Sequence, residues 1–288
     1  MSDPLPRVKE PHLAGRWYPA DPVELADLAR RLLDAGGPSR PGVLAIVVPH
    51  AAYQYSGRTA ATGFAAAGAA WRRAVILAPS HFANFRGACV LPMTAYRTPL
   101  GFVPIDQEAV ATLARTPRVQ ANPATFMREH ALEIELPLWQ TLAPGCPIVP
   151  LLVGALEGED AASLAAALRP LLARDTLVVV SSDLVHYGRR FGYLPVPATD
   201  AATVADAIRR LDEGALDHLV ACDADGFTRY VEETGATICG RSPIEVLLRA
   251  LPGGVRGEKL AYTTSLELTG DYEHSVSYAA VAFSAASV

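Results

Sequence analysis

Four uninterrupted apolar runs divide the chain, and three of them lead directly into a short polar segment. The four runs occupy residues 43–48, 74–78, 148–153 and 177–180 and contain many β-branched side chains. Such runs are typical of strands that are buried on both faces of a sheet. Two further strand patterns lie at 258–268 and 277–284, and glycine and proline punctuation predicts a short hairpin within 88–103.

Helical patterns separate these strands. Asp21 is expected to cap a helix over 22–33, Asp106 a helix near 107–115, and Ser242 a helix over 242–250. Other helices are predicted at 58–67, 129–142, 158–173, 200–211 and 222–233. The alternation indicates an α/β fold with a mainly parallel central sheet flanked by helices. Since no linker or repeat divides the chain, we expect one domain over residues 1–288.

Composition narrows the function classes. Half of the 288 residues are hydrophobic, 19% are charged and the net charge is −5, which excludes wholesale disorder and argues against a nucleic-acid partner. No apolar run is long enough to span a bilayer, and the charged N-terminus does not resemble a secretory signal, so we expect a cytoplasmic protein without a membrane partner. The four cysteines include no Cys-x-x-Cys pair, so a structural zinc knuckle is not expected.

Histidines follow three of the four apolar strands. The segments are VVPHAAYQYSG with His50, LAPSHF with His81, and VVSSDLVHYG with Asp183 and His186. In open α/β sheets, ligands bind outside the carboxyl ends of the strands. The 31-residue spacing of His50 and His81 is about one strand–helix–strand unit, so their strands are expected to be neighbours or near neighbours. The pattern therefore predicts a shared site, although each histidine alone could be an ordinary loop residue.

Two further segments carry candidate chemistry. Cys239 precedes a predicted helix start and stands near Arg241, a setting that lowers the pKa of a thiol and suits a metal ligand or a nucleophile; a packed, inert thiol is the alternative. His130 is expected to open the helix over 129–142, with Glu133 on the same face. That pair suits metal binding, proton transfer or support of a ligand, and equally a solvated helix face.

These segments together resemble the Memo family, whose prokaryotic members are called AmmeMemoRadiSam system protein B. The resemblance covers nearly the whole chain, through AGRWYP at 14–19, PHAAYQYSG at 49–57, PSH at 79–81, EHALE at 129–133, SSDLVHYG at 181–188 and ICGRSP at 238–243. It implies a fold similar to class III extradiol (LigB-type) dioxygenases, which use non-haem Fe(II).

The resemblance also implies a metal site on two histidines and a cysteine, matching His50, His81 and Cys239. Asp183 and His186 match positions lining the same pocket. The sequence departs from the family pattern where Phe82 replaces a frequent histidine and Ala52 a frequent glycine. The loss at 82 leaves the three expected ligands intact.

Three functions remain open. The first is a dioxygenase-like oxidoreductase with one transition-metal ion, Fe(II) first and copper or zinc next, in which His186 or His130 moves protons and Asp183 orients an imidazole. The second is a metal-free hydrolase or transferase with Cys239 as nucleophile and His186 or His130 as base. The third is an adaptor that binds a small molecule or peptide. The resemblance also implies radical-SAM and AMMECR-type partner proteins.

Overall fold

The four apolar runs form the central strands of a large sheet in the computed structural model, which describes residues 7–172 and 175–285. These strands are β2 (Val43–Val48), β3 (Arg73–Pro79), β8 (Ile148–Val153) and β9 (Thr176–Ser181). Their order is β2–β9–β3–β8, and each neighbouring pair is parallel. Every residue of β8 and β9 is buried, as expected for strands covered on both faces.

Antiparallel strands extend this core on both sides. β12 (His274–Ala285) runs antiparallel to β2, to β10 (His186–Gly188) and to β11 (Val255–Thr264). At the other end, β4 (Ala88–Val90) is antiparallel to β8 and parallel to β7 (Val119–Ala121). The α/β class is confirmed, but the nine-stranded sheet of the described residues is mixed, with parallel pairing concentrated in its centre.

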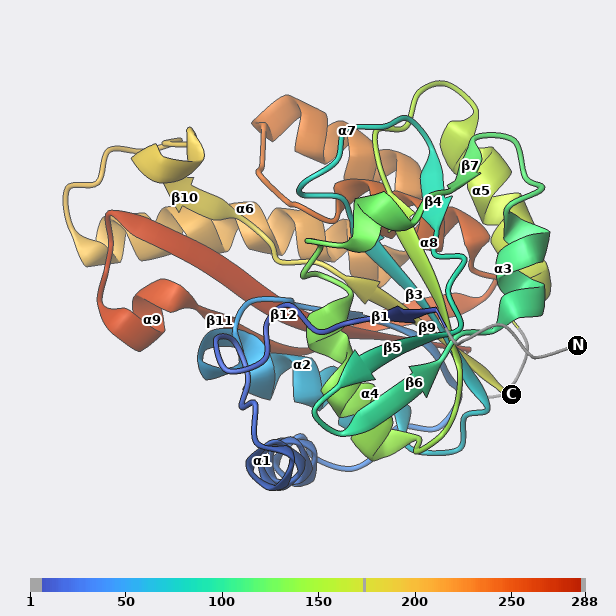
Figure 1. The fold of residues 1–288 in the computed structure, drawn as a ribbon. Coiled ribbons are helices and arrows are strands. Elements are labelled where there is room, and N and C mark those ends of the chain that lie inside the picture. The colour runs from blue at the N-terminus through green and yellow to red at the C-terminus, as the bar shows by residue number, and fades with distance from the viewer. Residues whose placement is uncertain (1–6, 173–174, 286–288) are drawn as a thin grey trace, which may run out of the picture.

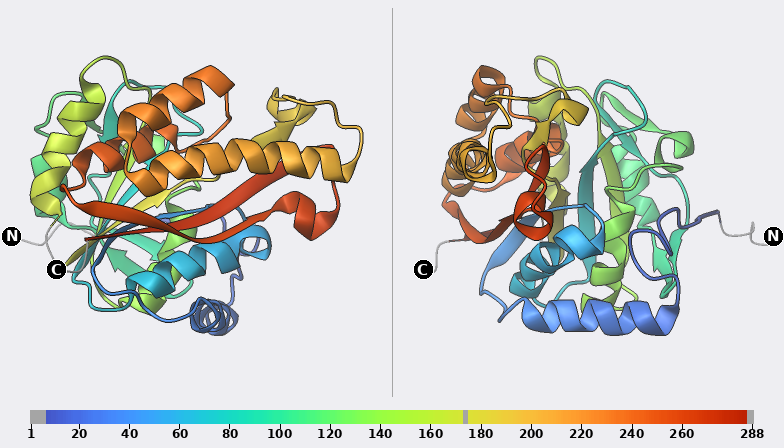
Figure 2. Two further views of the ribbon diagram at one scale, coloured as in Figure 1. Left: turned by 180° about the vertical axis from the view of Figure 1, so that it is seen from behind. Right: turned by 90° about the vertical axis from the view of Figure 1, so that its left-hand side faces the viewer.

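Helices cover both faces of the sheet (Figures 1 and 2). One layer contains α1 (Pro22–Ala35), α2 (Tyr53–Ala67) and α4 (Leu136–Leu142). The other contains α5 (Asp160–Leu168), α6 (Ala201–Ala221), α7 (Ala224–Thr234) and α8 (Arg241–Ala250). Two further helices are short: α3 (Gln107–Leu113) and α9 (Ser265–Thr269). A separate small sheet contains β1 (Val8–Lys9), β5 (Ala95–Thr98) and β6 (Gly101–Pro104).

Small side chains allow α2 to pack directly on the sheet. A Cβ atom placed on Gly63 would lie 2.4 Å from Val48 Cγ1, so even alanine would not fit there without movement. The predicted helix is thus confirmed in its packing, but it begins at Tyr53 rather than Arg58. None of the helices in the described ranges combines the length and apolar character needed to cross a membrane.

Several other element predictions hold within a few residues, but the helix expected over 200–211 extends to Ala221, and the strand expected over 258–268 ends at Thr264, where α9 follows. The N-caps Asp21 and Asp106 are confirmed, since each carboxylate accepts a backbone N–H of its helix. The hairpin predicted within 88–103 is only partly confirmed. The second half of this stretch forms the β5–β6 hairpin, whereas β4 in its first half joins the large sheet. The helix near 158–173 ends at Leu168, and a short 3-10 turn with a proline follows; position 173 lies outside the described residues.

The helix expected over 129–142 is wrong in its first half. A 3-10 turn covers Glu133–Glu135 and α4 begins only at Leu136. Two causes are visible. The side chain of Glu129 accepts the N–H groups of the next two residues, and Pro137 removes a backbone donor and crowds the preceding turn. His130 and Glu133 therefore do not share a helix face.

Candidate metal centre

Three parallel strands deliver the candidate side chains to one edge of the sheet. β9 lies between β2 and β3, so the segments that follow all three strands emerge at the same carboxyl edge. His50 follows β2, His81 follows β3 and Asp183 follows β9. The prediction that the strands before His50 and His81 are near neighbours is confirmed, with β9 between them.

Three histidines cluster at this edge: His50, His81 and His130. One ring nitrogen of each lies within 4.8 Å of those of the others. The ring centroid of His50 is 5.1 Å from that of His81 and 5.4 Å from that of His130. The His81 and His130 rings are stacked, with their centroids 4.3 Å apart. The cluster could hold a metal ion, and His130 joins the two histidines that the strand ends predicted.

His50 is the most buried member, with 2% of its surface exposed. Its backbone N–H donates to Asp183 Oδ1 at 2.8 Å, and its Nδ1 lies 2.9 Å from Ser181 Oγ. Its other nitrogen, Nε2, lies 3.2 Å from Cys239 Sγ. Burial, followed by the nearby His81 and His130, holds the pKa of His50 well below its usual value, so the ring is neutral and one nitrogen has a free lone pair.

The surroundings of Ser181 determine which nitrogen that is. Its hydroxyl donates its single hydrogen to the Ala131 carbonyl at 2.5 Å, and its oxygen also lies 2.9 Å from Glu135 Oε1. Burial raises the pKa of Glu135 well above its usual value. Because the serine hydrogen is directed to another oxygen, the serine oxygen accepts from His50 Nδ1. Nε2 of His50 is consequently the unprotonated nitrogen, as a metal ligand requires.

His81 is held in a similar way by Glu129, which is fully buried. The carboxylate accepts the His81 N–H at 2.7 Å and the His81 Nδ1 hydrogen at 2.9 Å, together with the N–H groups of His130 and Ala131. Burial alone would raise the pKa of Glu129, but the bond to His81 and the other donors outweigh it and lower that pKa. His81 Nε2 is therefore left for a ligand.

His130 is the member of the cluster that two aromatic side chains contact. Trp17 meets its ring edge-on at a centroid distance of 4.8 Å, and Phe82, with 51% of its surface exposed, lies 5.9 Å away. Burial, then the neighbouring His81, lowers the pKa of His130 to about 4, so this ring is neutral at neutral pH. The aromatic Phe82 thus occupies space next to the cluster but offers no metal donor.

Cys239 reaches the cluster because of a close backbone approach. A Cβ atom on Gly240 would lie 2.3 Å from Ser182 Cβ, and the Gly240 N–H donates to Ser182 Oγ at 3.0 Å. The expected lowering of the thiol pKa is wrong: burial, and then the charge of Asp183, raise the pKa of Cys239. The predicted helix cap is also wrong, since α8 begins at Arg241 with Gly240 as its N-cap residue.

Asp183 and His186 lie beside the cluster rather than within it. Asp183 Oδ2 is 4.0 Å from His50 Nε2, and burial raises the pKa of its carboxyl group. His186 Nδ1 lies 2.9 Å from the Leu184 carbonyl and 3.0 Å from the Thr237 carbonyl. Because both partners are acceptors, Nδ1 carries the hydrogen and Nε2 is able to accept a proton.

Glu133 serves the structure of the N-terminal segment instead of the histidine cluster. It is fully buried and forms a 2.8 Å ion pair with the equally buried Lys9. Its other donors are the Tyr18 hydroxyl and the N–H groups of His12 and Leu13. The carboxylate thereby fixes the segment that carries Trp17 against His130.

Sequence reasoning missed Glu129, Ser181 and Glu135 as parts of the site. Glu129 and Ser181 lie in two of the motifs that carry the family resemblance. Nothing in the local sequence pattern, however, shows which side chain turns toward a histidine. One signal was available for Glu135: a carboxylate between the apolar residues Ile134 and Leu136 is a candidate for burial.

The distance between His50 and Cys239 is close to the spacing of nitrogen and sulfur on one metal ion. Two imidazole nitrogens near 2.0–2.1 Å and a thiolate near 2.3 Å from one tetrahedral ion would place nitrogen and sulfur about 3.5 Å apart. His50 Nε2 and Cys239 Sγ are 3.2 Å apart. The buried partners of His50 and His81 supply the outer hydrogen bonds that metal-binding histidines usually have.

Comparison with known proteins gives consistent matches along nearly the whole chain. The family model described as Memo-like protein matches residues 9–282. Protein MEMO1 of Danio rerio is 33% identical over 289 residues, covering 94% of this chain and 96% of that protein. A MEMO1 family protein of Methanopyrus kandleri is 32% identical over 96% of this chain and 98% of its own length.

Two other similarities are more distant or less complete. Protein memo-1 homolog of Caenorhabditis elegans is 30% identical over 92% of this chain and 79% of that protein. Among solved structures, an uncharacterized protein of Escherichia coli K12 overlaps 83% of this chain and 98% of its own, with a TM-score of 0.43 and 16% identity.

Proposed function

The chain belongs to the family of Memo-like proteins, and on this premise we propose that it is an oxidoreductase that depends on one Fe(II) ion. His50, His81 and Cys239 are the proposed ligands. One observation carries the proposal: each histidine has its Nδ1 engaged by a buried partner, which leaves Nε2 for the ion. Cys239 Sγ stands 3.2 Å from Nε2 of His50.

Two imidazoles and one thiolate leave coordination positions open, as in the facial-triad iron oxygenases. A bound Fe(II) ion would supply redox chemistry with O₂ that side chains alone do not offer. Because a thiolate is softer than the carboxylate of those enzymes, copper and zinc also suit the site, and the substrate does not follow from the similarity to catechol dioxygenases.

The surrounding residues have separable roles in this proposal. Asp183 accepts the backbone N–H of His50 and so fixes the ring at the strand end. His130, neutral and stacked on His81, accepts a proton from a bound small molecule, and His186 Nε2 is a second acceptor. Trp17 and Phe82 flank the His130 ring and limit the access of water to it.

Oxygen uptake tests the proposed reaction class. Protein purified without oxygen and loaded with Fe(II) is mixed with a panel of catechols and thiols, and oxygen consumption is compared with that of His81→Ala. We expect uptake in the wild type with at least one substrate and loss of at least tenfold in the variant. Stoichiometric iron without uptake on the whole panel would favour a binding protein over an enzyme.

A metal-free thiol enzyme is the second candidate, favoured by the contact between Cys239 Sγ and His50 Nε2. His50, rather than His130 or His186, would then be the base, oriented by Ser181. The raised pKa of the thiol works against this candidate. Rapid alkylation of Cys239 at neutral pH in protein that binds no metal would favour it.

We also propose a cytoplasmic location, because a thiolate ligand is preserved in a reducing compartment. The four cysteines are all free, as such a location requires. Radical-SAM and AMMECR-type proteins are the proposed partners, and this part rests on the family resemblance.

A further inference from the structure

A cavity of about 570 Å³ adjoins the proposed site on the side of Cys239. It lies where the ends of β3 and β8 meet the start of α8, and Cys239 forms part of its wall. The lining is otherwise made of small or neutral residues, among them Ser80, Asn84 and Phe85. Its volume is in the usual range for a small organic ligand.

Arg241 is the single charged residue among those that line this cavity. It is exposed at the first position of α8, and within the described ranges no ion pair or side-chain hydrogen bond engages its guanidinium. A guanidinium without a carboxylate partner in an otherwise neutral cavity favours an anionic ligand.

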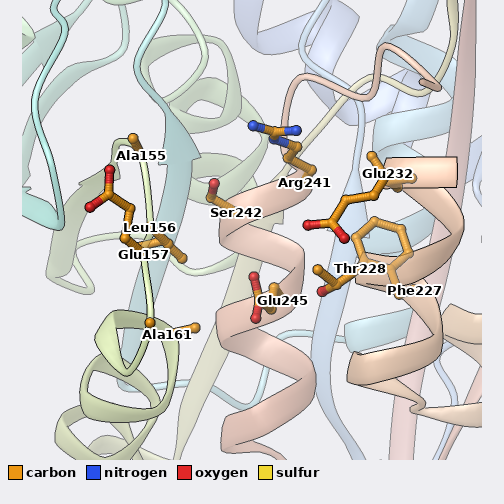
Figure 3. A pocket seen from close by; sticks show the side chains of 12 residues that line it. Ala155, Leu156, Glu157, Ala161, Phe227, Thr228, Glu232, Arg241, Ser242 and Glu245 are labelled. Atoms are coloured by element: carbon orange, nitrogen blue, oxygen red, sulfur yellow. The ribbon is translucent and has the colours of Figure 1, made fainter.

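Arg241 also lines a second cavity, shown in Figure 3, and the acidic residues near it line that cavity rather than the first. Figure 3 shows the Arg241 guanidinium at the start of the helix, pointing away from Glu245 farther along it. Glu245 pairs with Arg249 and Glu157 pairs with Arg86. Glu232 lines that second cavity but forms no ion pair with Arg241 within the described ranges. These carboxylates therefore leave the guanidinium available.

We propose that this cavity binds the carboxylate of a small organic acid, with Arg241 as the residue that selects the charge. The inference rests on the proposed function, since it places the substrate next to Cys239. A bidentate pair between guanidinium and carboxylate would position the rest of the acid within reach of the sulfur. The start of α8 adds to the positive potential, because Gly240 provides no side-chain cap.

Two alkylating reagents of nearly equal size test the charge selection. Iodoacetate is anionic and iodoacetamide is neutral, and each loses iodide when the Cys239 sulfur attacks it. Labelling of Cys239 is measured by peptide mass spectrometry in chelator-treated full-length protein, so neither a metal nor oxygen is needed. The ratio of the two rates is compared among wild type, Arg241→Gln and the control Arg210→Gln, which changes an exposed arginine of α6.

We expect Arg241→Gln to lower the iodoacetate-to-iodoacetamide ratio about fivefold, as loss of one nearby partly solvated charge implies. Arg210→Gln should leave the ratio unchanged, as should the ratio at Cys222 in all three proteins. A change in thiol acidity affects both reagents alike and cancels. An unchanged ratio in Arg241→Gln overturns the proposal, whatever the metal content turns out to be.

A second measurement does not require the thiol to react. Malonate should raise the Tm of wild type and Arg210→Gln but not of Arg241→Gln, whereas the neutral malonamide should raise none of them. If Cys239 reacts with neither reagent, this result decides alone. Equal shifts by malonate in all three proteins, or no shift in any, would overturn the proposal.

Discussion

Glu129→Gln perturbs the site through a residue that touches two of its histidines. The carboxylate accepts one N–H at Oε2, from His81, and three hydrogens at Oε1. The oxygen of glutamine can replace Oε1, but its NH₂ group then faces the His81 N–H and cannot accept it. His81 also loses the negative charge that makes its Nε2 a stronger ligand.

The expected magnitudes follow from these contacts. One buried donor left without an acceptor costs about 1–3 kcal/mol of unfolding free energy. A chain of 288 residues has an unfolding entropy near 0.6 kcal/mol per degree, so Tm should fall by about 2–5 °C. Loss of an outer partner of a metal-binding histidine should weaken Fe(II) binding about 10- to 100-fold.

The assay is anaerobic titration with Fe(II), with thermal unfolding measured on the same samples. Glu133→Gln is the matched control, because Glu133 is equally buried and pairs with Lys9 rather than with a histidine. Breaking that pair should cost about 3–5 kcal/mol but change iron affinity less than about threefold. Unchanged affinity in Glu129→Gln, or an equal loss in both variants, would refute the assigned role of Glu129.

Three further results are expected. Lys9→Met should lower the unfolding free energy by about 3–5 kcal/mol in urea denaturation. Adding Glu133→Gln should recover part of the loss rather than add to it, because glutamine removes the unpaired buried charge and keeps an oxygen for the donors Tyr18 and Leu13. His130→Ala should retain iron in elemental analysis while oxygen uptake falls, because His130 is proposed to accept protons; loss of iron would make it a ligand instead. Burial raises the pKa of Asp212 to about 6, so the native state holds this proton more tightly than the unfolded chain does, and about 3 kcal/mol of stability should disappear as pH rises from about 3 to 7. Asp212→Asn should flatten this part of the profile in denaturation at several pH values, and an unaltered profile would contradict the assignment.

The centre of the fold was predictable because continuous apolar runs are typical of strands that are buried on both faces of a sheet. The runs at 43–48 and 148–153 are strands with those same bounds. Strand direction was harder to predict. The long β12 returns antiparallel beside β2, and its apolar pattern carries no information on direction. The mixed character of the sheet therefore emerged only from the structure.

The candidate site was predictable as far as strand ends could place it. His50, His81 and Asp183 follow neighbouring parallel strands, so their meeting required only the order of the strands. Cys239 was placed chiefly by the family resemblance, and its position depends on the backbone approach at Gly240.

Long-range pairing explains what sequence reasoning got wrong. Glu133 was expected beside His130, yet its partner Lys9 lies 124 positions away in a charged, Pro-rich segment. Nothing local indicates that this lysine is fully buried. Likewise, the helix over 129–142 failed because Glu129 uses its carboxylate to bind N–H groups that a helix start would leave open.

The most direct test of the central claim is the metal content of protein purified without oxygen, measured by elemental analysis. The wild type should contain close to one iron per chain, and His50→Ala, His81→Ala and Cys239→Ala should each lose most of it. Glu133→Gln, which leaves the three proposed ligands in place, should keep it. Stoichiometric metal that survives all three alanine substitutions, or a wild type that binds no metal even when Fe(II) is supplied, would contradict the account.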